Sequence, residues 1–399
     1  MNYLKNSYCI IGGGLLGLSI GMQLSKKGKK ITIFEKENAL GIHQSGRNSG
    51  VLHCGLHYKP GSLKAKLAVE GINKMIQFCN NNKIEYEQCG KIIVANDDNE
   101  IKSLEKLAKR GKENGLIGLR KLNKSELSRR EPNIKSTCTL LVPDEGIVNF
   151  KGVVSMMKSI IKNNGGKIKT NEEFLGIKKH KKNIIITTTK KQYEFDFLIN
   201  CSGLFVDRVY EKCTGISSPL KIIPFRGDYL KFKPEYSSLI NHLVYPSPNP
   251  KYPFLGVHFT RTISGYREIG PNAVLALKRE GYFWWNFDVR DSLESLCFKG
   301  LRKFIIQNKN FVLNQIATSL FKYKFLFEAK KMMPGLKSEM LQKGNSGVRA
   351  QAMDNYGNLI MDFKIEKFEN QIHILNAPSP GATACISIAD YILNDYLNV

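Results

Sequence analysis

The feature that most constrains the fold is a patterned stretch close to the start of the chain. Ser7–Glu37 reads SYCIIGGGLLGLSIGMQLSKKGKKITIFEKE. An apolar, β-prone run at Tyr8–Ile11 precedes glycines that fit G-x-G-x-x-G, and a small-residue helical run follows at Leu15–Leu24. Lys30–Phe34 then reads as a second strand. This order predicts a βαβ unit and therefore an α/β, Rossmann-like domain.

Each residue of this unit has a task if the unit binds an adenine dinucleotide. Gly12 permits the tight turn, Gly14 lets backbone approach a pyrophosphate, and Gly17 lets the helix pack close on the sheet. Glu35, at the end of the second strand, suits ribose hydroxyls and would repel a 2′-phosphate. The competing interpretation is a glycine-rich turn without a ligand. The acid in this position favours a dinucleotide whose adenosine ribose carries no 2′-phosphate.

Length and composition describe an ordinary globular chain. Its 399 residues, 42% of them hydrophobic, suffice for two or three domains. The apolar run Cys9–Met22 is short and broken by glycines, so a membrane-spanning helix is not expected. None of the nine cysteines lies closer than ten positions to the next, which excludes CxxC pairs. With no secretory signal at the start, we expect reduced thiols, a cytoplasmic location and no metal site.

The formal net charge of +25 allows two interpretations. Scattered, solvated lysines account for it most simply. Alternatively, the charge attracts nucleic acid, anionic lipid surfaces or acidic substrates. The chain has no recognisable RNA-binding module and no basic stripe with interleaved aromatics, so no nucleic acid is expected as a partner. A basic RNA-binding flavoprotein stays open as an alternative.

Later segments divide between two discontinuous domains. Residues 1–83, 143–217 and 340–399 are expected to form the dinucleotide-binding domain, and 84–142 with 218–339 a substrate domain on a mixed or antiparallel sheet. Residues 291–331 carry Leu, Phe and Ile at helical spacing among lysines. They predict a helical pair packed on the sheet or, alternatively, a cationic amphipathic surface on a membrane.

A polar, glycine-dotted segment, HQSGRNSGVLHCGLHYK (His43–Lys59), follows the βαβ unit directly. Small and donor-rich residues suit backbone that lies flat against an isoalloxazine ring, which points to a flavin. Further candidates lie in CSGLFVDRV (Cys201–Val209) and in the loop before a helix that we expect to begin at Ala382–Ala384, where N–H groups would face the flavin. The predicted cofactor-binding residues from these segments are Ser45, Arg47, Asn48, Ser49, Gly203, Pro380, Gly381, Ala382 and Thr383.

Long stretches of the chain resemble the FAD-dependent L-2-hydroxyglutarate oxidase/dehydrogenase family, within the D-amino-acid oxidase-like flavoproteins. The resemblance is carried by His43–Leu67, Cys201–Val209, Ile222–Phe232, Tyr252–Arg261, Gly270–Tyr282, Ser346–Phe363 and Asn376–Ile392. It implies non-covalent FAD and oxidation of L-2-hydroxyglutarate to 2-oxoglutarate. His57 stands where relatives are expected to have a tyrosine, which puts a catalytic role for His57 in doubt.

Oxidation of a 2-hydroxy acid by hydride transfer requires a carboxylate clamp and a proton acceptor. Arg349, in GVRAQ, is the first choice for the α-carboxylate, because the corresponding arginine of related amino-acid oxidases grips carboxylates and a guanidinium binds them through two hydrogen bonds. Arg226 is a candidate for the distal carboxylate, with pairing to Asp228 as the alternative. For the base, His53 ranks before His258, and His43 follows both.

Related chemistry remains open from the sequence. A flavoenzyme that oxidises an amino acid or glycerol 3-phosphate is the alternative within the same fold. The electron acceptor is oxygen or a membrane quinone, and a quinone would suit peripheral contact with an anionic membrane, on the inner face of the plasma membrane.

Overall fold

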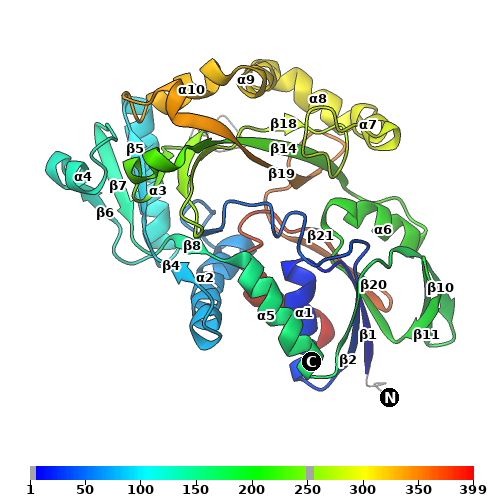
Figure 1. Ribbon diagram of the computed structural model, residues 1–399. Helices are drawn as coiled ribbons and strands as arrows, with labels where there is room; N and C mark the ends of the chain where they lie inside the picture. Colours follow the sequence, from blue (N-terminus) through cyan, green and yellow to red (C-terminus); the bar gives the residue numbers. More distant parts are fainter. Residues whose placement is uncertain (1–5, 249–255) are drawn as a thin grey trace.

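The computed structural model describes residues 6–248 and 256–399. Two large sheets, one above the other in Figure 1, organise the chain. The lower sheet has the order β20-β21-β13-β1-β2-β9, with five parallel strands and an antiparallel edge strand, β20. Its strands are β1 (Ser7–Ile11), β2 (Lys30–Phe34), β9 (Lys167–Lys169), β13 (Phe197–Asn200), β20 (Lys364–Phe368) and β21 (Gln371–Asn376).

The lower sheet is covered on both faces, as parallel sheets require. Alternate residues of β1 enter two different clusters: Tyr8 and Ile10 pack with the helical layer, whereas Cys9 and Ile11 pack with a small sheet on the opposite face. The helical layer holds α1 (Leu15–Lys26), α2 (Leu63–Asn81), α5 (Phe150–Asn163) and α11 (Cys385–Ile392). The small sheet holds β10 (Phe174–His180), β11 (Asn183–Thr188) and β12 (Gln192–Phe195), with α6 (Val206–Thr214) beside it.

The upper sheet is nine-stranded and mixed, because β15 and β5 pair in parallel and the other pairs are antiparallel. Its strands are β5 (Lys91–Ala95), β6 (Arg120–Leu122), β7 (Cys138–Val142), β14 (Lys221–Phe232), β15 (Leu243–Pro246), β16 (His258–Arg261), β17 (Arg267–Gly270), β18 (Val274–Leu275) and β19 (Leu341–Met353). The helices α3 (Asp98–Glu113) and α4 (Lys124–Arg130) lie in the chain between β5 and β7. The expected α/β architecture with a mixed-sheet second domain is confirmed.

One strand lies outside the domain to which the sequence assigned it. Residues 340–399 were expected in the dinucleotide-binding domain, but β19 pairs along most of β14 in the upper sheet. We therefore propose a domain boundary after Met353. Segments expected in the two domains also meet in a three-stranded sheet of β3 (Val51–Leu52), β8 (Gly146–Val148) and β4 (Tyr86–Glu87).

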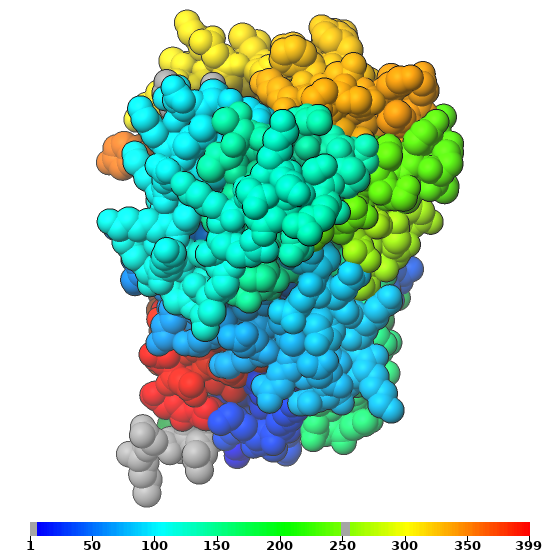
Figure 2. Space-filling view, turned by 90° about the vertical axis from the view of Figure 1, so that its left-hand side faces the viewer, coloured from blue at the N-terminus to red at the C-terminus, as the bar shows by residue number. Residues whose placement is uncertain are grey.

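The expected helical pair at 291–331 is four short helices: α7 (Val289–Leu296), α8 (Lys299–Gln307), α9 (Lys309–Leu320) and α10 (Lys322–Lys330). Backbone dihedrals leave the helical region at Asn308 and Phe321, which ends the helices there. Phe304 and Phe325 point inward and are buried. The four helices form the yellow and orange top of the molecule in Figure 2. Among the described residues, no helix is both long enough and apolar enough to span a bilayer.

Candidate functional site

A cavity of about 740 Å³ runs through the middle of the molecule, a volume within the range of small-molecule and cofactor sites. Its walls come from segments far apart in the chain. At one end lie Gly12, Gly14 and Glu35, and the walls also include His53, His258 and Arg349. Every predicted cofactor-binding residue lines the cavity except Gly17, and the three catalytic candidates His53, His258 and Arg349 line it too.

The end of β1 and the start of α1 have the geometry expected of a dinucleotide turn. Gly12 has a φ of +106°, and a Cβ there would lie 2.5 Å from a backbone oxygen of Cys201. Gly17 packs so closely that a Cβ would lie 2.1 Å from the Gly12 carbonyl oxygen, which explains why it supports the turn without lining the cavity. Gly14 caps α1, whose first turn carries no acidic residue. The helix N-terminus is therefore open to an anion.

Glu35 holds the second feature of a dinucleotide site. Its carboxylate accepts hydrogen bonds from the N–H groups of Gly13 (2.9 Å) and Glu37 (3.0 Å). These bonds fix the acid at the cavity edge beside the glycine turn. The residues present therefore fit a dinucleotide with a free adenosine ribose.

The polar segment after β2 follows the cavity wall. The N–H of Leu15 donates to Ser45 Oγ (2.9 Å), and Asn48 closes its own turn by donating to the Gln44 and Ser45 carbonyl oxygens. Further along, the His53 N–H donates to Thr383 Oγ1 (3.2 Å), and the Thr383 hydroxyl donates to the Val51 carbonyl oxygen (3.2 Å). Thr383 thus ties the loop before α11 to the strand that presents His53. The predicted helix start at 382–384 lies just before the observed start at Cys385.

Arg349 lies on β19, opposite Phe225 of β14. Burial raises the pKa of the neighbouring Tyr229, and the Arg349 charge and hydrogen bond partly offset this rise. Arg349 also acts electrostatically on His258. The Arg349 guanidinium, a cation with several N–H donors, therefore borders the cavity near the candidate bases.

His258 is buried on β16 and stacks on Tyr245, with ring centroids 3.9 Å apart. Its Nδ1 lies 2.8 Å from the Gly256 carbonyl oxygen, so Nδ1 carries the hydrogen and Nε2 is the acceptor. Burial, helped by the positive charges of Lys91 and Arg349, lowers the pKa of His258 to about 3. His258 therefore stays neutral near pH 7, where it can accept a hydrogen bond but is a weak base.

His53 has a different environment. Its Nδ1 lies 3.2 Å from Oε2 of Glu145, whose side chain is 1% exposed. Because a carboxylate accepts, Nδ1 carries the hydrogen and Nε2 is left as the basic atom. This arrangement favours His53 over His258 as the proton acceptor.

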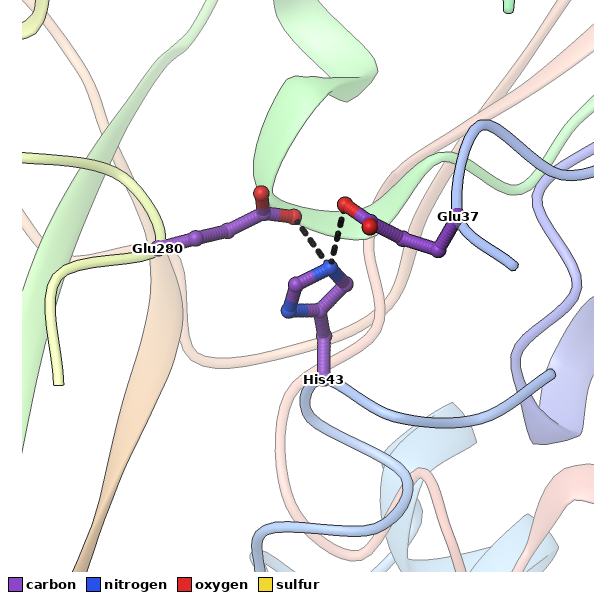
Figure 3. Close-up of side chains that lie close together, drawn as sticks. All are labelled: Glu37, His43 and Glu280. Carbon is purple, nitrogen blue, oxygen red and sulfur yellow. Dashed lines mark hydrogen bonds and ion pairs between the residues drawn. The ribbon is translucent and has the colours of Figure 1, made fainter. Parts of the chain in front are cut away.

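His43 lines the cavity but has both ring nitrogens engaged. Nδ1 lies 2.6 Å from the Tyr282 hydroxyl, and Nε2 lies between Glu37 (3.1 Å) and Glu280 (2.9 Å), as Figure 3 shows. Glu37, His43 and Glu280 offer atoms within 4.8 Å of one another that could bind a metal ion, but the Lys36 ammonium already pairs with both carboxylates. His43 is thus an ion-pair partner that ties the cofactor-side loop to the 270–282 segment.

Arg226 requires a correction. It is not among the described residues that line the cavity; it is 2% exposed, pairs with Asp228 (Nε–Oδ1 2.9 Å) and lies over Trp284 at 4.3 Å. Successive residues of a strand point to opposite faces, and Gly227 and Tyr229 of β14 take the cavity face. Arg226 is therefore turned away from the place where a substrate would lie.

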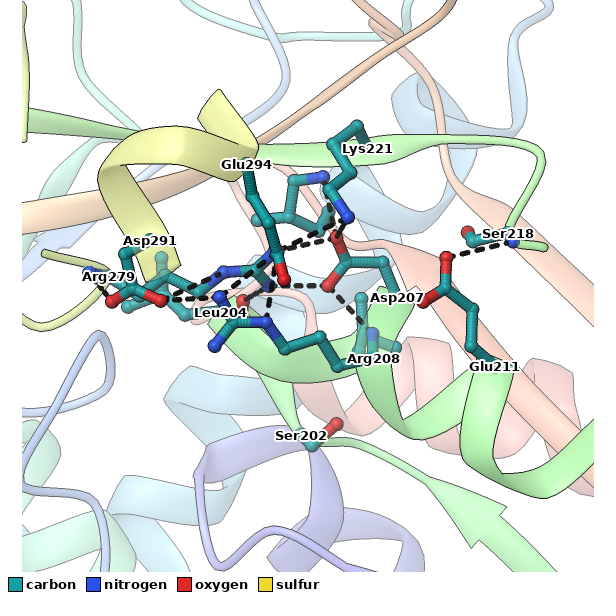
Figure 4. A network of polar contacts seen from close by, with 12 residues as sticks. Ser202, Leu204, Asp207, Arg208, Glu211, Ser218, Lys221, Arg279, Asp291 and Glu294 are labelled. Carbon is teal, nitrogen blue, oxygen red and sulfur yellow. Dashed lines mark hydrogen bonds and ion pairs between the residues drawn. The ribbon is translucent and has the colours of Figure 1, made fainter. Parts of the chain in front are cut away.

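A buried ion-pair network fixes the wall that follows Gly203 (Figure 4). The Arg279 guanidinium donates to the Leu204 carbonyl oxygen (2.5 Å) and to Asp207 Oδ2 (2.8 Å), and the Arg208 guanidinium donates to Asp291 Oδ1 (2.5 Å). Gly203, at φ +55°, precedes this network and lines the cavity. The network locks the start of α6 to α7 and thereby fixes one domain against the other.

Three residues near the histidines were not found from the sequence. Glu145 lies in the turn between β7 and β8, Lys91 begins β5, and Tyr245 lies on β15, just before its last residue, Pro246. None belongs to a local motif, because only the pairing of distant strands places them near His53 and His258. An acid between two short apolar strands, as in VPDEGIV, was the one available signal.

Comparisons with known proteins agree with this geometry. The family model described as DAO, FAD dependent oxidoreductase, matches residues 7–394. L-2-hydroxyglutarate dehydrogenase from Escherichia coli (strain K12) is 42% identical over 390 residues, covering 97% of this chain and 92% of that protein. The mitochondrial L-2-hydroxyglutarate dehydrogenase of Mus musculus is 38% identical, covering 96% of this chain and 87% of that protein.

Solved structures share the fold at low sequence identity. L-alpha-glycerophosphate oxidase from Mycoplasma pneumoniae, with FAD bound, has a TM-score of 0.78 at 20% identity, covering 98% of this chain and 94% of that chain. Glycine oxidase from Geobacillus kaustophilus has a TM-score of 0.73 at 16% identity, with the same coverages. With its glycine turn, fixed acid and central cavity, and with a family match across nearly its full length, the chain belongs to the DAO family of FAD-dependent oxidoreductases, among the L-2-hydroxyglutarate dehydrogenases.

Proposed function

We propose that the protein oxidises L-2-hydroxyglutarate to 2-oxoglutarate with non-covalently bound FAD. The observation that carries the proposal is one continuous cavity that joins the dinucleotide turn to Arg349, His53 and His258. The names of the relatives at about 40% identity supply the substrate.

Each cavity residue has a role in this reaction. FAD, when bound, accepts the hydride from the substrate α-carbon. Arg349 grips the α-carboxylate through two charge-assisted hydrogen bonds. His53 takes the hydroxyl proton, and neutral His258 accepts a hydrogen bond that orients the substrate. The N–H groups around Thr383 and the start of α11 place a positive dipole toward the flavin.

The distal carboxylate of a five-carbon diacid needs a cation other than Arg226. We propose Arg110 of α3, which lines the cavity and donates from Nη1 to the His57 carbonyl oxygen (3.0 Å). The remaining guanidinium donors suit a carboxylate. Arg110→Gln should weaken the binding of L-2-hydroxyglutarate much more than the binding of L-2-hydroxybutyrate, which lacks the second carboxylate. Equal loss for both acids would refute the assignment.

The direct test is anaerobic mixing of the FAD-loaded protein with candidate substrates while the visible flavin absorbance is recorded. L-2-hydroxyglutarate should bleach the flavin, and 2-oxoglutarate should appear in equal amount. An unchanged spectrum with L-2-hydroxyglutarate, together with bleaching by glycine or glycerol 3-phosphate, would establish the alternative substrate class. Filter binding of RNA against salt concentration tests the remaining alternative, for which a steep salt dependence is required.

We further propose that electrons leave to a membrane quinone and that α7–α10 rest on an anionic membrane. Their outer face exposes Leu313 (63%), Tyr323 (65%) and Phe327 (63%), and residues 289–331 hold nine Lys and Arg against three acids. Exposed apolar side chains among cations suit an interfacial contact. Oxygen is the alternative acceptor.

Sedimentation with phosphatidylserine vesicles tests this contact. The wild type should pellet, whereas a Leu313→Ser, Phe327→Ser variant should remain in the supernatant. Ile117→Ser is the matched control, because Ile117 is 82% exposed in the loop after α3. Failure of the wild type to pellet, or equal loss in the control, would count against the surface.

A further inference from the structure

Behind the cavity wall at His53 lies a buried pair of opposite charges. The Lys91 side chain is 0% exposed and the Glu145 side chain 1% exposed, and their charged groups form an ion pair. Glu145 also contacts His53 Nδ1 (3.2 Å) and accepts from the Cys54 thiol (3.5 Å). The Lys91 ammonium lies 4.2 Å from the Tyr245 ring centroid, and Tyr245 stacks on His258.

Strand pairing brings these residues together. Leu52 of β3 pairs with Gly146 of β8 in antiparallel register, so His53, the next residue, lies opposite Glu145. Lys91 pairs with Val142 at the end of β7, and the turn that follows leads to Glu145. The three side chains thus come from three segments that meet where the two domains join.

Burial of two charges is unfavourable because both lose their hydration, unless the charges contact each other and form hydrogen bonds. Burial works against ionisation of Glu145, but the Lys91 charge and the hydrogen bonds from His53 and Lys91 outweigh it and hold the pKa of Glu145 well below its usual value. Glu145 is therefore a fixed carboxylate, and only one partner, His53, faces the cavity. A purely structural ion pair has no need of a cavity-lining third member.

We propose that Glu145 is a positioning residue for substrate oxidation, which holds the His53 Nδ1–H so that the basic Nε2 faces the substrate, and that Lys91 keeps Glu145 ionised. The inference rests on the proposed function. In the step concerned, the substrate O–H bond breaks and its proton goes to His53 Nε2. The α-carbon hydride, with its electron pair, goes to FAD, and the carbinol carbon becomes a carbonyl. Glu145 stabilises the resulting imidazolium without taking the proton.

The charged groups behind His53 are the Glu145 carboxylate and, beyond it, the Lys91 ammonium, so removal of either one changes the electrostatic field at His53. His57 and His258 also act on this group, and burial lowers the pKa of each to about 3, so both are neutral near pH 7. Tyr245, Tyr58, Cys54 and Cys89 are further titratable neighbours that stay neutral, because burial raises their pKa values. Asp144 is a partly buried carboxyl next to Glu145, and its pKa is also raised by burial.

The test compares Glu145→Gln and Lys91→Met with Glu131→Gln as the matched control. Glu131 is also a buried acid that holds a histidine, His242 (Nδ1–Oε1 2.9 Å), but neither lines the cavity. Two readouts are used with the FAD-loaded protein. One is the pH dependence of the rate of flavin reduction by L-2-hydroxyglutarate, and the other is NMR titration of nitrogen-labelled histidine, with His53 assigned from the loss of its signal in His53→Gln.

Glu145→Gln should lower the pH at which His53 takes up a proton and slow flavin reduction by about tenfold to hundredfold, with 2-oxoglutarate affinity largely retained. Lys91→Met should move His53 protonation to higher pH, and Glu145→Asp should restore part of the rate. Glu131→Gln should change neither readout. If Glu145→Gln and Glu145→Asp titrate and react like the control, the inference is overturned. Should wild-type flavin not respond to L-2-hydroxyglutarate, the proposed function fails, while the NMR titration still tests the His53–Glu145 coupling.

Discussion

Replacement of Arg349 tests the substrate end of the cavity most sharply. A bidentate guanidinium–carboxylate contact contains two charge-assisted hydrogen bonds, each worth about 1.5–3 kcal/mol. Arg349→Met removes both, so binding should weaken by about 3–6 kcal/mol, or roughly 10² to 10⁴-fold. Arg349→Lys keeps the charge but loses the fork, so about half of that free energy should be lost. Titration of the FAD-loaded variants with 2-oxoglutarate, followed through the flavin spectrum, measures these changes.

Arg226→Met is the matched control for this prediction. Both arginines lie on paired strands of the upper sheet, β14 and β19, yet Arg226 pairs with Asp228 away from the cavity. The control should lower stability by leaving Asp228 without its arginine, with only the Ser319 hydroxyl still donating to its carboxylate, but 2-oxoglutarate affinity should stay close to that of the wild type. Arg349 is not the carboxylate clamp if Arg349→Met binds 2-oxoglutarate as tightly as the wild type, or if Arg226→Met loses as much affinity as Arg349→Met.

Three other predictions concern the cofactor turn, the buried network and pH. Gly12→Ala should weaken FAD binding by about tenfold or more in a FAD fluorescence titration, because Ala disfavours φ +106° and its Cβ meets a carbonyl oxygen at 2.5 Å. Gly28→Ala also places Ala at a positive backbone angle, φ +72°, but it has open space around it and is not among the described residues that line the cavity, so it should leave FAD binding unchanged. Arg279→Met should lower the free energy of unfolding by about 3–5 kcal/mol in urea, since Asp207 is left buried without its main partner. Because the pKa of His258 is about 3 when folded, below its ordinary 6.5, its contribution to stability is complete above pH 6.5 and is lost as pH falls toward 3. His258→Phe should therefore remove about 2 kcal/mol of the stability difference between pH 7 and pH 5.

The cofactor end could be predicted because its signals are local. The positions of Gly12, Gly14 and Glu35 follow from a single βαβ unit, and each lines the cavity where the sequence places it. The sequence of residues 183–200, NIIITTTKKQYEFDFLIN, predicts a hairpin followed by a buried strand, and these residues form β11, β12 and β13. Short-range periodicity is sufficient for such elements.

The substrate end depends on long-range pairing, which the sequence does not display. Arg226 and Arg349 both look like strand arginines, but only the pleat of β14 and its neighbours decides which one faces the cavity. Glu145 has no motif and acquires its partner from the register of β3 with β8. The four helices at 289–330 were read as a pair because their apolar spacing continues across the breaks at Asn308 and Phe321. Of the stretch Tyr252–Arg261, which carries part of the family resemblance, residues 252–255 lie outside the described residues.

A crystal structure of the FAD-loaded protein with 2-oxoglutarate shows directly whether the cavity is the active site. We expect the isoalloxazine ring in the central cavity, the α-carboxylate on the Arg349 guanidinium, and the keto oxygen within hydrogen-bond distance of His53 Nε2. A keto acid bound elsewhere, or with its α-carboxylate out of reach of Arg349 and its keto oxygen away from His53, would contradict this expectation.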